Sequence, residues 1–156
     1  MRGDADVIEL LNEVLTAELT AINQYFIHAK MLKNFGYKRL AKQKWDESIE
    51  EMKHADEIID RILFLEGVPN MQRLFPVKVG EEPVEMHKID LELELAARER
   101  LTRGIVLTNQ KNDHGTRHLL EKILHNEEEA IDWLETQLHL IAELGRENYL
   151  TEQMKD

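Results

Sequence analysis

The sequence predicts an all-α protein: a four-helix bundle with one long connection between its second and third helices and a short fifth helix at the C-terminus. Three observations lead to this fold class. Only 3 prolines and 7 glycines interrupt the 156 residues. Apolar residues recur every three or four positions through four long segments, as they do on the buried face of a helix. One of the connections between those segments is much longer than the others, as in bundles with a crossover.

The first helix is expected over residues 6–34, with Asp4 or Asp6 as its N-cap and Gly36 just after its end. One face is apolar apart from a single carboxylate and carries Val7, Leu11, Val14, Glu18, Ala21, Tyr25, His28 and Leu32. A second apolar face carries Ile8, Leu15, Leu19, Ile22 and Phe26. A surface helix needs only one such face, so we expect this helix to be covered on two sides.

The second helix is expected over residues 38–66 and ends at Gly67. Its inner face carries Glu51, His54 or Ala55, Ile58, Ile62 and Leu65. Its second apolar face carries Trp45, Ile49, Met52, Ile59 and Leu63. Like the first helix, it therefore has apolar side chains on both sides.

Residues 67–83 form the long connection and contain all the prolines. A helix of about 28 residues is roughly 42 Å long, and about 16 extended residues reach roughly 50 Å. The connection can therefore run the length of the bundle and start the third helix parallel to the second. The short connections near Gly36 and Gly115 instead predict antiparallel neighbours.

The third helix is expected over residues 84–111, the fourth over 114–144 with Asp113 as its cap, and the fifth over 146–154. The inner face of the third carries Ile89 or Asp90, Leu91, Glu94, Leu95, Leu101, Ile105 and Thr108. That of the fourth carries Leu119 or Leu120, Ile123, Glu127, Ala130, Leu134, Leu138 and Ile141. Gly104 is expected to weaken the third helix locally.

Length and charge narrow the class of function. A chain of 156 residues suits a single domain, residues 1–156, with a substantial core. The 20 basic and 31 acidic residues give a net charge of −11, which argues against nucleic-acid and anionic-lipid partners. Cysteine is absent, which excludes disulfides and thiolate metal sites. No apolar signal segment and no run of about 18 apolar residues occurs, so we expect a soluble, cytoplasmic protein.

Four helices each place one glutamate near mid-length on an otherwise apolar face; these are Glu18, Glu51, Glu94 and Glu127. Four carboxylates at one level of a core repel one another strongly unless cations neutralise them. His54 lies three residues after Glu51 and therefore on the same side of its helix. Two divalent ions bound by these carboxylates and this imidazole would satisfy the whole set.

Di-iron sites in helix bundles carry one glutamate on each of two helices and a Glu-x-x-His motif on each of the other two. Here both single acids and the first motif are present. The second motif is incomplete, because Ala130 stands three residues after Glu127. His125 and Glu129 are rotated off that face by about 100° or more, so neither replaces the missing imidazole.

Met52 lies inside the first motif but points about 100° away from its two ends. Its thioether is either a filler of an apolar contact or a ligand of haem iron. We expect Tyr25 and Trp133 to be core aromatics near the site. Asp46 and Glu50 lie one turn apart. Such a pair usually belongs to a solvent-exposed helix face, although the two carboxylates could still bind a cation. Surface positions are expected for His28, His87, His114, His118, His125 and His139.

The chain resembles bacterioferritin along its whole length. The segments that carry the resemblance are NQYF (23–26), EMKHAD (51–56), RILFLEG (61–67), IDWLET (131–136) and ENYL (147–150). The resemblance implies a ferritin-like four-helix bundle that assembles into a hollow cage, a 24-mer, around a ferric mineral. It also implies a ferroxidase di-iron centre in each subunit. On that basis Glu18 and His54 bind one iron, Glu94 and Glu127 bind the other, and Glu51 and Glu127 can bridge the two.

The resemblance further makes Met52 a ligand of a b-type haem between two subunits, with one methionine from each. The stripe that could bury this haem consists of Leu19, Ile22, Phe26 and Met52. Two positions depart from the family. The family usually has a histidine where this chain has Ala130, and some members have a histidine where it has Asp46.

We therefore expect an iron-storage and detoxification subunit whose ferroxidase activity, from ferrous to ferric iron with oxygen or peroxide, is weakened by Ala130. It would form a homo-oligomer or assemble with a second bacterioferritin chain that keeps the full site. Two alternatives stay open. In one, water or a shifted carboxylate completes a working ferroxidase site. In the other, the chain is a haem-binding structural or electron-transfer subunit that relies on a partner chain for ferroxidase activity.

Overall fold

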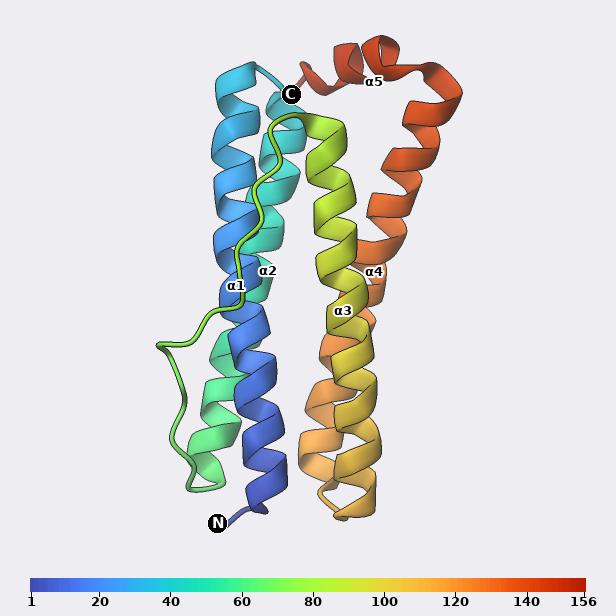
Figure 1. Ribbon diagram of the computed structural model, residues 1–156. Coiled ribbons are helices and arrows are strands. Elements are labelled where there is room, and N and C mark those ends of the chain that lie inside the picture. The colour runs from blue at the N-terminus through green and yellow to red at the C-terminus, as the bar shows by residue number, and fades with distance from the viewer.

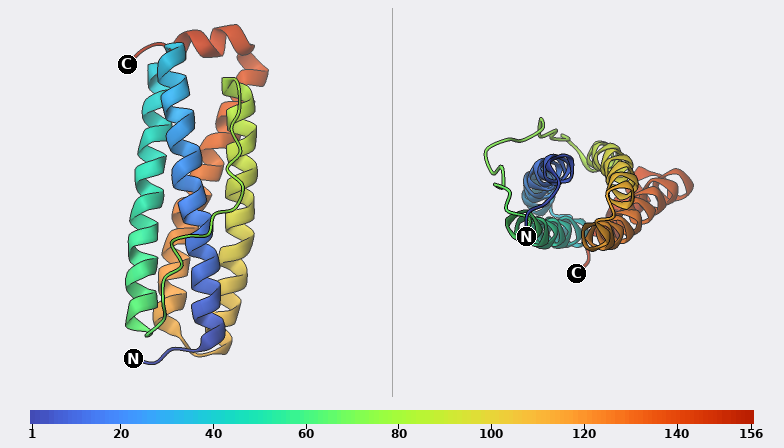
Figure 2. Two further views of the ribbon diagram at one scale, coloured as in Figure 1. Left: turned by 60° about the vertical axis from the view of Figure 1, so that its left-hand side comes forward. Right: turned by 90° about the horizontal axis from the view of Figure 1, so that it is seen from below.

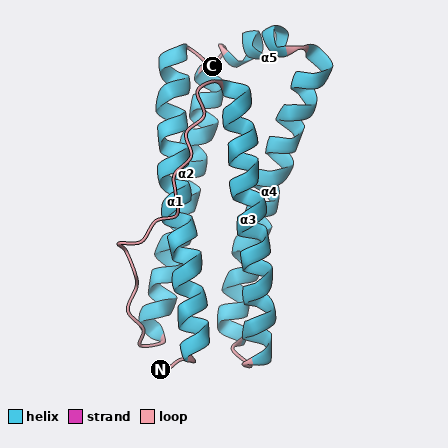
Figure 3. Cartoon of the chain, viewed as in Figure 1, coloured by secondary structure: helices cyan, strands magenta, loops and turns pink.

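The fold consists of five helices and no strand (Figure 3), which confirms the predicted fold class. A computed structural model describes all 156 residues. The helices are α1 (Ala5–Phe35), α2 (Lys38–Phe64), α3 (Pro83–Gln110), α4 (His114–Leu144) and α5 (Arg146–Gln153). Each begins and ends within two residues of the position that the sequence predicts. None of the five combines the length and apolar character that a membrane-spanning helix needs.

The long helices form two antiparallel pairs around one core. Helices α1 and α2 make one hairpin and α3 and α4 the other (Figure 1), and the view from below in Figure 2 shows all four around a common centre. Because the connection after α2 returns to the opposite end of the bundle, α2 and α3 run in the same direction, as the length of this connection predicted. Helix α5 lies across the end where α3 begins.

The crossover follows α1, which presents an acceptor side chain on turn after turn. The backbone hydrogen bonds are Asn70 N–H to Asn12 (2.8 Å), Phe75 N–H to Thr20 (3.0 Å), Lys78 N–H to Gln24 (3.2 Å) and Gly80 N–H to His28 (2.9 Å). Acceptors spaced by multiples of four lie along one side of a helix. They satisfy backbone donors of a segment without regular structure, and so they fix where α3 starts.

One residue at each end sets where α1 begins and ends. Of the two candidate caps, Asp4 is the one used: its carboxylate accepts from the N–H groups of Asp6 (2.8 Å) and Val7 (3.3 Å). Gly36 follows the last turn with φ of 92°, a left-handed conformation that glycine adopts without strain.

Two apolar clusters fill the two ends of the bundle. The larger one lies where α1 begins and consists of Val7, Leu10, Leu11, Val14, Leu15, Ala55, Ile58, Ile62, Leu65, Leu101, Leu120 and Ile123. The smaller one lies beneath α5 and consists of Leu32, Leu40, Ala41, Met86, Tyr149 and Leu150. The inward-facing glutamates of the sequence occupy the stretch between these clusters.

Gly104 serves helix packing. A Cβ at this position would lie 2.7 Å from a Leu10 methyl carbon and 2.9 Å from one of Leu120. The missing side chain therefore lets α3 approach α1 and α4 closely, which offsets the weak helix propensity of glycine.

Asp113 holds the start of α4 by accepting hydrogen bonds from the N–H (3.0 Å) and hydroxyl (2.7 Å) of Thr116 and from the guanidinium of Arg61 (2.9 Å). We expect D113A to lower the free energy of unfolding by about 1–2 kcal/mol, because the cap is lost and Arg61 loses its carboxylate partner, keeping only its hydrogen bond to the Thr116 hydroxyl. The D113N control keeps the capping oxygen and should lose less. Urea unfolding followed by circular dichroism measures both, and equal losses would contradict the capping role.

Candidate metal centre

Five buried side chains from four helices converge near the middle of the bundle. They are Glu18 of α1, Glu51 and His54 of α2, Glu94 of α3 and Glu127 of α4, each at most 2 % exposed. The helical periodicity of each segment turns its acid inward, and the two antiparallel hairpins bring the acids to one level. The structure thus brings together every residue of the predicted metal site.

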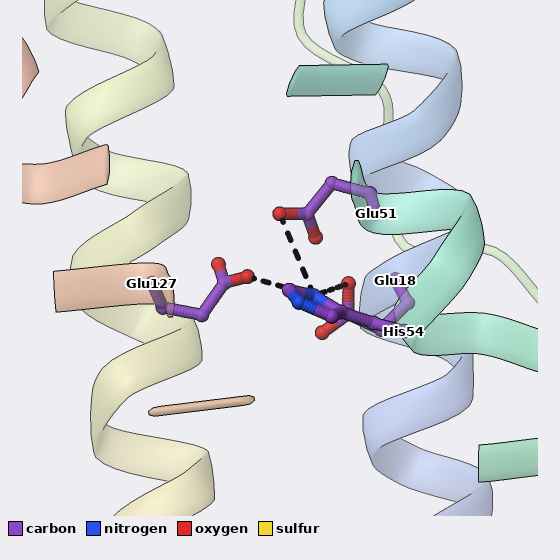
Figure 4. A group of neighbouring side chains, drawn as sticks. All are labelled: Glu18, Glu51, His54 and Glu127. Carbon is purple, nitrogen blue, oxygen red and sulfur yellow. Dashed lines mark ion pairs between the residues drawn. The ribbon is translucent and has the colours of Figure 1, made fainter. Parts of the chain in front are cut away.

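The imidazole of His54 lies among the acids (Figure 4). Its Nδ1 is 3.1 Å from Glu127 Oε1, 3.6 Å from Glu18 Oε2 and 4.0 Å from Glu51 Oε1. One ligand atom from each of these four residues lies within 4.8 Å of the others. This spacing is small enough for all four to bind one metal ion.

Four buried atoms of the site make no hydrogen bond of acceptable geometry, although two of them, His54 Nδ1 and Glu127 Oε1, lie 3.1 Å apart: the four are Glu18 Oε2, His54 Nδ1, Glu94 Oε2 and Glu127 Oε1. Buried polar atoms are almost always paired in folded proteins, so this group points to a bound cation. Glu94 stands apart from the tight group of four, and its Oε1 accepts a 2.6 Å hydrogen bond from the hydroxyl of Tyr25. Carboxylate oxygens with imidazole nitrogen suit a divalent iron-like ion.

In the metal-free site, some of the four glutamates are protonated and therefore uncharged. Burial, and then the charge of Glu127, raises the pKa of Glu18 and holds those of Glu51 and Glu94 well above their usual range. Burial alone would raise the pKa of Glu127 too, but hydrogen bonds from its neighbours, Glu94 first, outweigh it and give a pKa of about 2. Burial alone would lower the pKa of His54, yet its contacts with Glu127 and Glu18 raise it to about 10. Metal binding must therefore displace protons.

Asn126 of α4 is a contact that the sequence analysis missed. Its side-chain amide lies 3.0 Å from Nε2 of His54, so only Nδ1 is free to face a metal. Histidine ligands usually donate a hydrogen bond from the second ring nitrogen, which fixes the orientation of the ring; Asn126 can accept this bond through its amide oxygen when its side-chain amide is turned over. No periodic signal marks Asn126, because its partner belongs to another helix.

Ala130 lies buried one turn after Glu127, and α4 offers no second imidazole to the site. The two nearby candidates, His125 and Glu129, are exposed and pair with each other at 3.0 Å. As the sequence predicted, neither takes the place of the missing ligand.

Two cavities reach the site from opposite sides of the bundle. One, of about 210 Å³, is lined by α1, α3 and the crossover and includes the cations Lys78 and Arg100. The other, of about 250 Å³, is lined by α2 and α4 and includes Glu47, Glu50 and Glu129 but no lysine or arginine. A metal cation therefore meets an acidic entrance on the α2–α4 side.

Met52 points away from the site and is 53 % exposed. It belongs to an apolar outer face of α1 and α2, whose other exposed members are Phe26, Trp45 and Ile49. The rings of Phe26 and Trp45 pack with their centroids 5.5 Å apart. Of the outward stripe that the sequence predicted, Phe26 and Met52 are exposed, whereas Leu19 and Ile22 are partly buried and pack against the core.

Asp46 and Glu50 form ion pairs with Lys42 (2.7 Å) and Lys53 (3.2 Å) on the exposed side of α2. Both acids already have a cationic partner within α2. The structure therefore favours the solvated-face interpretation of this pair over a cation site.

The predicted surface positions of two histidines are wrong. His28 and His87 are completely buried, because they belong to a second polar layer that includes Lys44 and Asp90. A buried lysine has no signature in a single sequence. The remaining four, His114, His118, His125 and His139, are exposed as predicted. Tyr25 is a core aromatic next to the site, and Trp133 lines the α2–α4 cavity.

Comparison with known proteins gives a consistent answer. Residues 8–144 match the model of the ferritin-like domain. A bacterioferritin of Streptomyces coelicolor is 54 % identical over 151 residues, which cover 97 % of this chain and 90 % of that one. Bacterioferritin BfrA of Mycobacterium tuberculosis is 52 % identical over 96 % of this chain and 94 % of its own. A bacterioferritin of Brucella melitensis is 44 % identical over 96 % and 92 %.

Removing one buried charge should stabilise the metal-free protein. The pKa of Glu51 is raised well above 4.5 in the fold, so ionising this acid costs stability above that pH. We expect E51Q to raise the free energy of unfolding at pH 7, because the fold then no longer has to hold this buried acid in its charged form. The gain should vanish below about pH 4.5, where the carboxyl is protonated in both states.

Urea unfolding after chelation tests this expectation, with E50Q on the exposed side of α2 as the matched control. The E50Q variant should unfold like the parent protein. An E51Q protein that is less stable than the parent at pH 7 would show that these acids do not repel one another in the metal-free fold.

Proposed function

This chain belongs to the bacterioferritins of the ferritin-like family, and we propose that it stores and detoxifies iron as a cage subunit that oxidises ferrous iron slowly. Iron storage follows from the family. The observation that carries the oxidation step is the set of four buried ligand atoms, one from each long helix, that lie close together and make no hydrogen bond of acceptable geometry within the protein. Oxygen-rich ligands with imidazole nitrogen fit iron as the substrate of this site.

We assign Glu18 and His54 to one iron position and Glu94 and Glu127 to the other, with Glu51 and Glu127 able to bridge. The geometry supports this division. His54 Nδ1 lies between Glu18 and Glu127 at 3.6 and 3.1 Å, as a ligand next to a bridging acid should. Glu94 is anchored separately through Tyr25, on the side of the second position.

The reaction requires two ferrous ions to lose one electron each while one dioxygen takes up both electrons and two protons. The residues of the chain contribute binding, orientation and charge. Anionic, hard carboxylates favour ferric over ferrous iron, so they promote oxidation. The acidic α2–α4 entrance attracts the cation.

Ala130 weakens iron binding at the second position. That position has carboxylates but lacks an imidazole, whereas the first has His54 held by Asn126. Loss of a partner behind a metal ligand costs about 10–100-fold in affinity or activity, and loss of a ligand should cost at least as much. We therefore propose that the homopolymer is a weak ferroxidase.

The variant A130H completes the second motif and should restore the second iron position. We expect anomalous diffraction from crystals soaked in ferrous ion to show two full peaks in A130H, but one peak or none in the parent. Stopped-flow oxidation should become about 10–100-fold faster in A130H. A130Q, which adds bulk without an imidazole, is the control and should stay slow.

Two full peaks in the parent protein would mean that water or a shifted carboxylate completes the site. A fast phase in the parent that saturates at about two irons per subunit, the number that such carboxylate bundles hold, would likewise overturn the weak-site proposal.

A second candidate function rests on the outer face of α1 and α2. Here the chain is a haem-binding structural or electron-transfer subunit, and a partner chain supplies ferroxidase activity. The observation that favours it is Met52, exposed among apolar residues, because a thioether ligates haem iron and a b-type haem needs apolar walls. When bound, the haem would supply one-electron transfer between two subunits. A pure homopolymer that fails to mineralise any iron would support this candidate over the first.

The variant M52L tests the haem assignment. Leucine keeps the apolar volume but removes the sulfur, so we expect the haem absorption band to be lost while the helical content and assembly stay unchanged. Met71, also exposed but on the crossover, provides the control variant M71L, which should keep its haem. Undiminished haem in M52L would rule out Met52 as the ligand.

For the assembly we propose a hollow 24-mer, formed by this chain alone or mixed with a second bacterioferritin subunit. The proposal rests on the family and on the large apolar area that α1 and α2 leave exposed. The family alone leads us to place the protein in the cytoplasm.

A further inference from the structure

A second buried polar layer lies beneath α5, away from the metal centre. Its members come from every helix but α4 and are fully or almost fully buried: His28 of α1, Lys44 of α2, His87 and Asp90 of α3, and Tyr149 of α5. Buried lysine is rare in proteins. Nothing in the proposed iron chemistry uses this layer.

Each hydrogen bond around His87 has a fixed direction. Lys44 Nζ lies 3.0 Å from His87 Nδ1, and an ammonium group can only donate, so Nδ1 accepts and carries no proton. The proton is therefore on Nε2, which donates to the hydroxyl of Tyr149 at 3.0 Å. Tyr149 donates in turn to Gln137 of α4 at 2.7 Å. His87 is thus neutral and links α2 to α5.

Asp90 neutralises Lys44 and completes the layer. Its carboxylate accepts from Lys44 (2.7 Å), from Gln24 (2.9 Å) and from Nδ1 of His28 (3.0 Å). Nε2 of His28 accepts from the N–H of Gly80 at 2.9 Å. Both histidines are therefore neutral. In each ring the unprotonated nitrogen accepts from a group that can only donate, the Lys44 ammonium for His87 and the Gly80 N–H for His28.

We propose that this layer is an acid-sensitive latch that holds α5 on the bundle and opens when His87 takes up a proton. Protonation of Nδ1 would place two cations 3.0 Å apart in a buried site, where their repulsion is weakly screened. The imidazole must then leave Lys44. Because the ring also bonds Tyr149, the residue that anchors α5, the movement loosens this helix.

Helix α5 is the element that can respond without loss of the bundle. It has only 8 residues, of which Tyr149, Leu150 and Gln153 are buried. A helix this short is not stable without packing. The four long helices keep their own core when α5 moves, since the larger apolar cluster lies at the other end.

The charges around His87 support a response below neutral pH. The groups that face it are Lys44 from α2, His28 from α1, Asp90 from its own helix and Tyr149 from α5, and α4 contributes the uncharged Trp133 and Gln137. Burial, and then Lys44, lowers the pKa of His87 well below its ordinary value of 6.5.

The direction of the pH effect follows. The undocked form binds a proton at the ordinary pKa and the docked form does not, so docking weakens as pH falls below about 6.5. The pKa of Asp90 is about 2, so this carboxylate keeps its charge throughout that range and is not the trigger.

Hydrogen exchange of the assembled protein tests the latch. Between about pH 7 and pH 5, exchange of the α5 amides, corrected for intrinsic chemistry, should rise about tenfold or more, while α1–α4 stay protected. Trp133, whose ring packs edge-on against His87 at 5.5 Å, provides a second signal. In a W45F background its fluorescence should change over the same pH range.

The variant H87Q separates titration from structure, because glutamine offers one acceptor to Lys44 and one donor to Tyr149 at every pH. We expect H87Q to keep α5 docked and to abolish its pH response. H28Q, which alters the neighbouring histidine, should retain the response. K44M removes the opposing cation but not the burial of His87, so it should weaken the response without abolishing it. A pH-independent α5 in the parent protein, or an unchanged response in H87Q and K44M, would overturn the proposal.

Discussion

Burying four carboxylates at one level of a helical core needs a positive charge that the chain does not fully supply. In the metal-free fold, His54 and shared protons meet part of this need, and four ligand atoms still make no hydrogen bond of acceptable geometry. The bundle keeps the site in place because apolar clusters fill both of its ends. Hydrophobic burial in those clusters provides the stability that holds mutually repelling acids together.

The two buried polar layers of the protein solve the same problem in different ways. Beneath α5, Lys44 provides an internal cation for Asp90, and every hydrogen bond in that layer is satisfied. At the centre no lysine is present, and the acids must receive a cation from outside. A layer whose polar groups are all hydrogen-bonded holds its helices together and changes only when it takes up a proton. A layer whose ligand atoms lack hydrogen bonds can instead bind a cation.

The two faces of α2 place neighbouring residues in different surroundings. Glu51 and His54 turn inward to the metal centre, and Met52 between them turns outward to an apolar surface. A helix rotates by about 100° per residue, so neighbours in sequence face different partners. Ala130 leaves the centre with one imidazole without disturbing this arrangement, because it is small, apolar and buried.

The sequence by itself determined the five helices, their directions, the level of the four acids and the missing imidazole at Ala130. Each of these depends on periodicity within one segment or on the length of one connection, both of which are local properties. Only the tertiary structure decided which side chains meet. Lys44 and Asp90, or His87 and Tyr149, come from separate helices, and Asn126 reaches His54 across the bundle. A helical pattern states which face is buried but not what it is buried against, and for that reason His28 and His87 were misplaced at the surface.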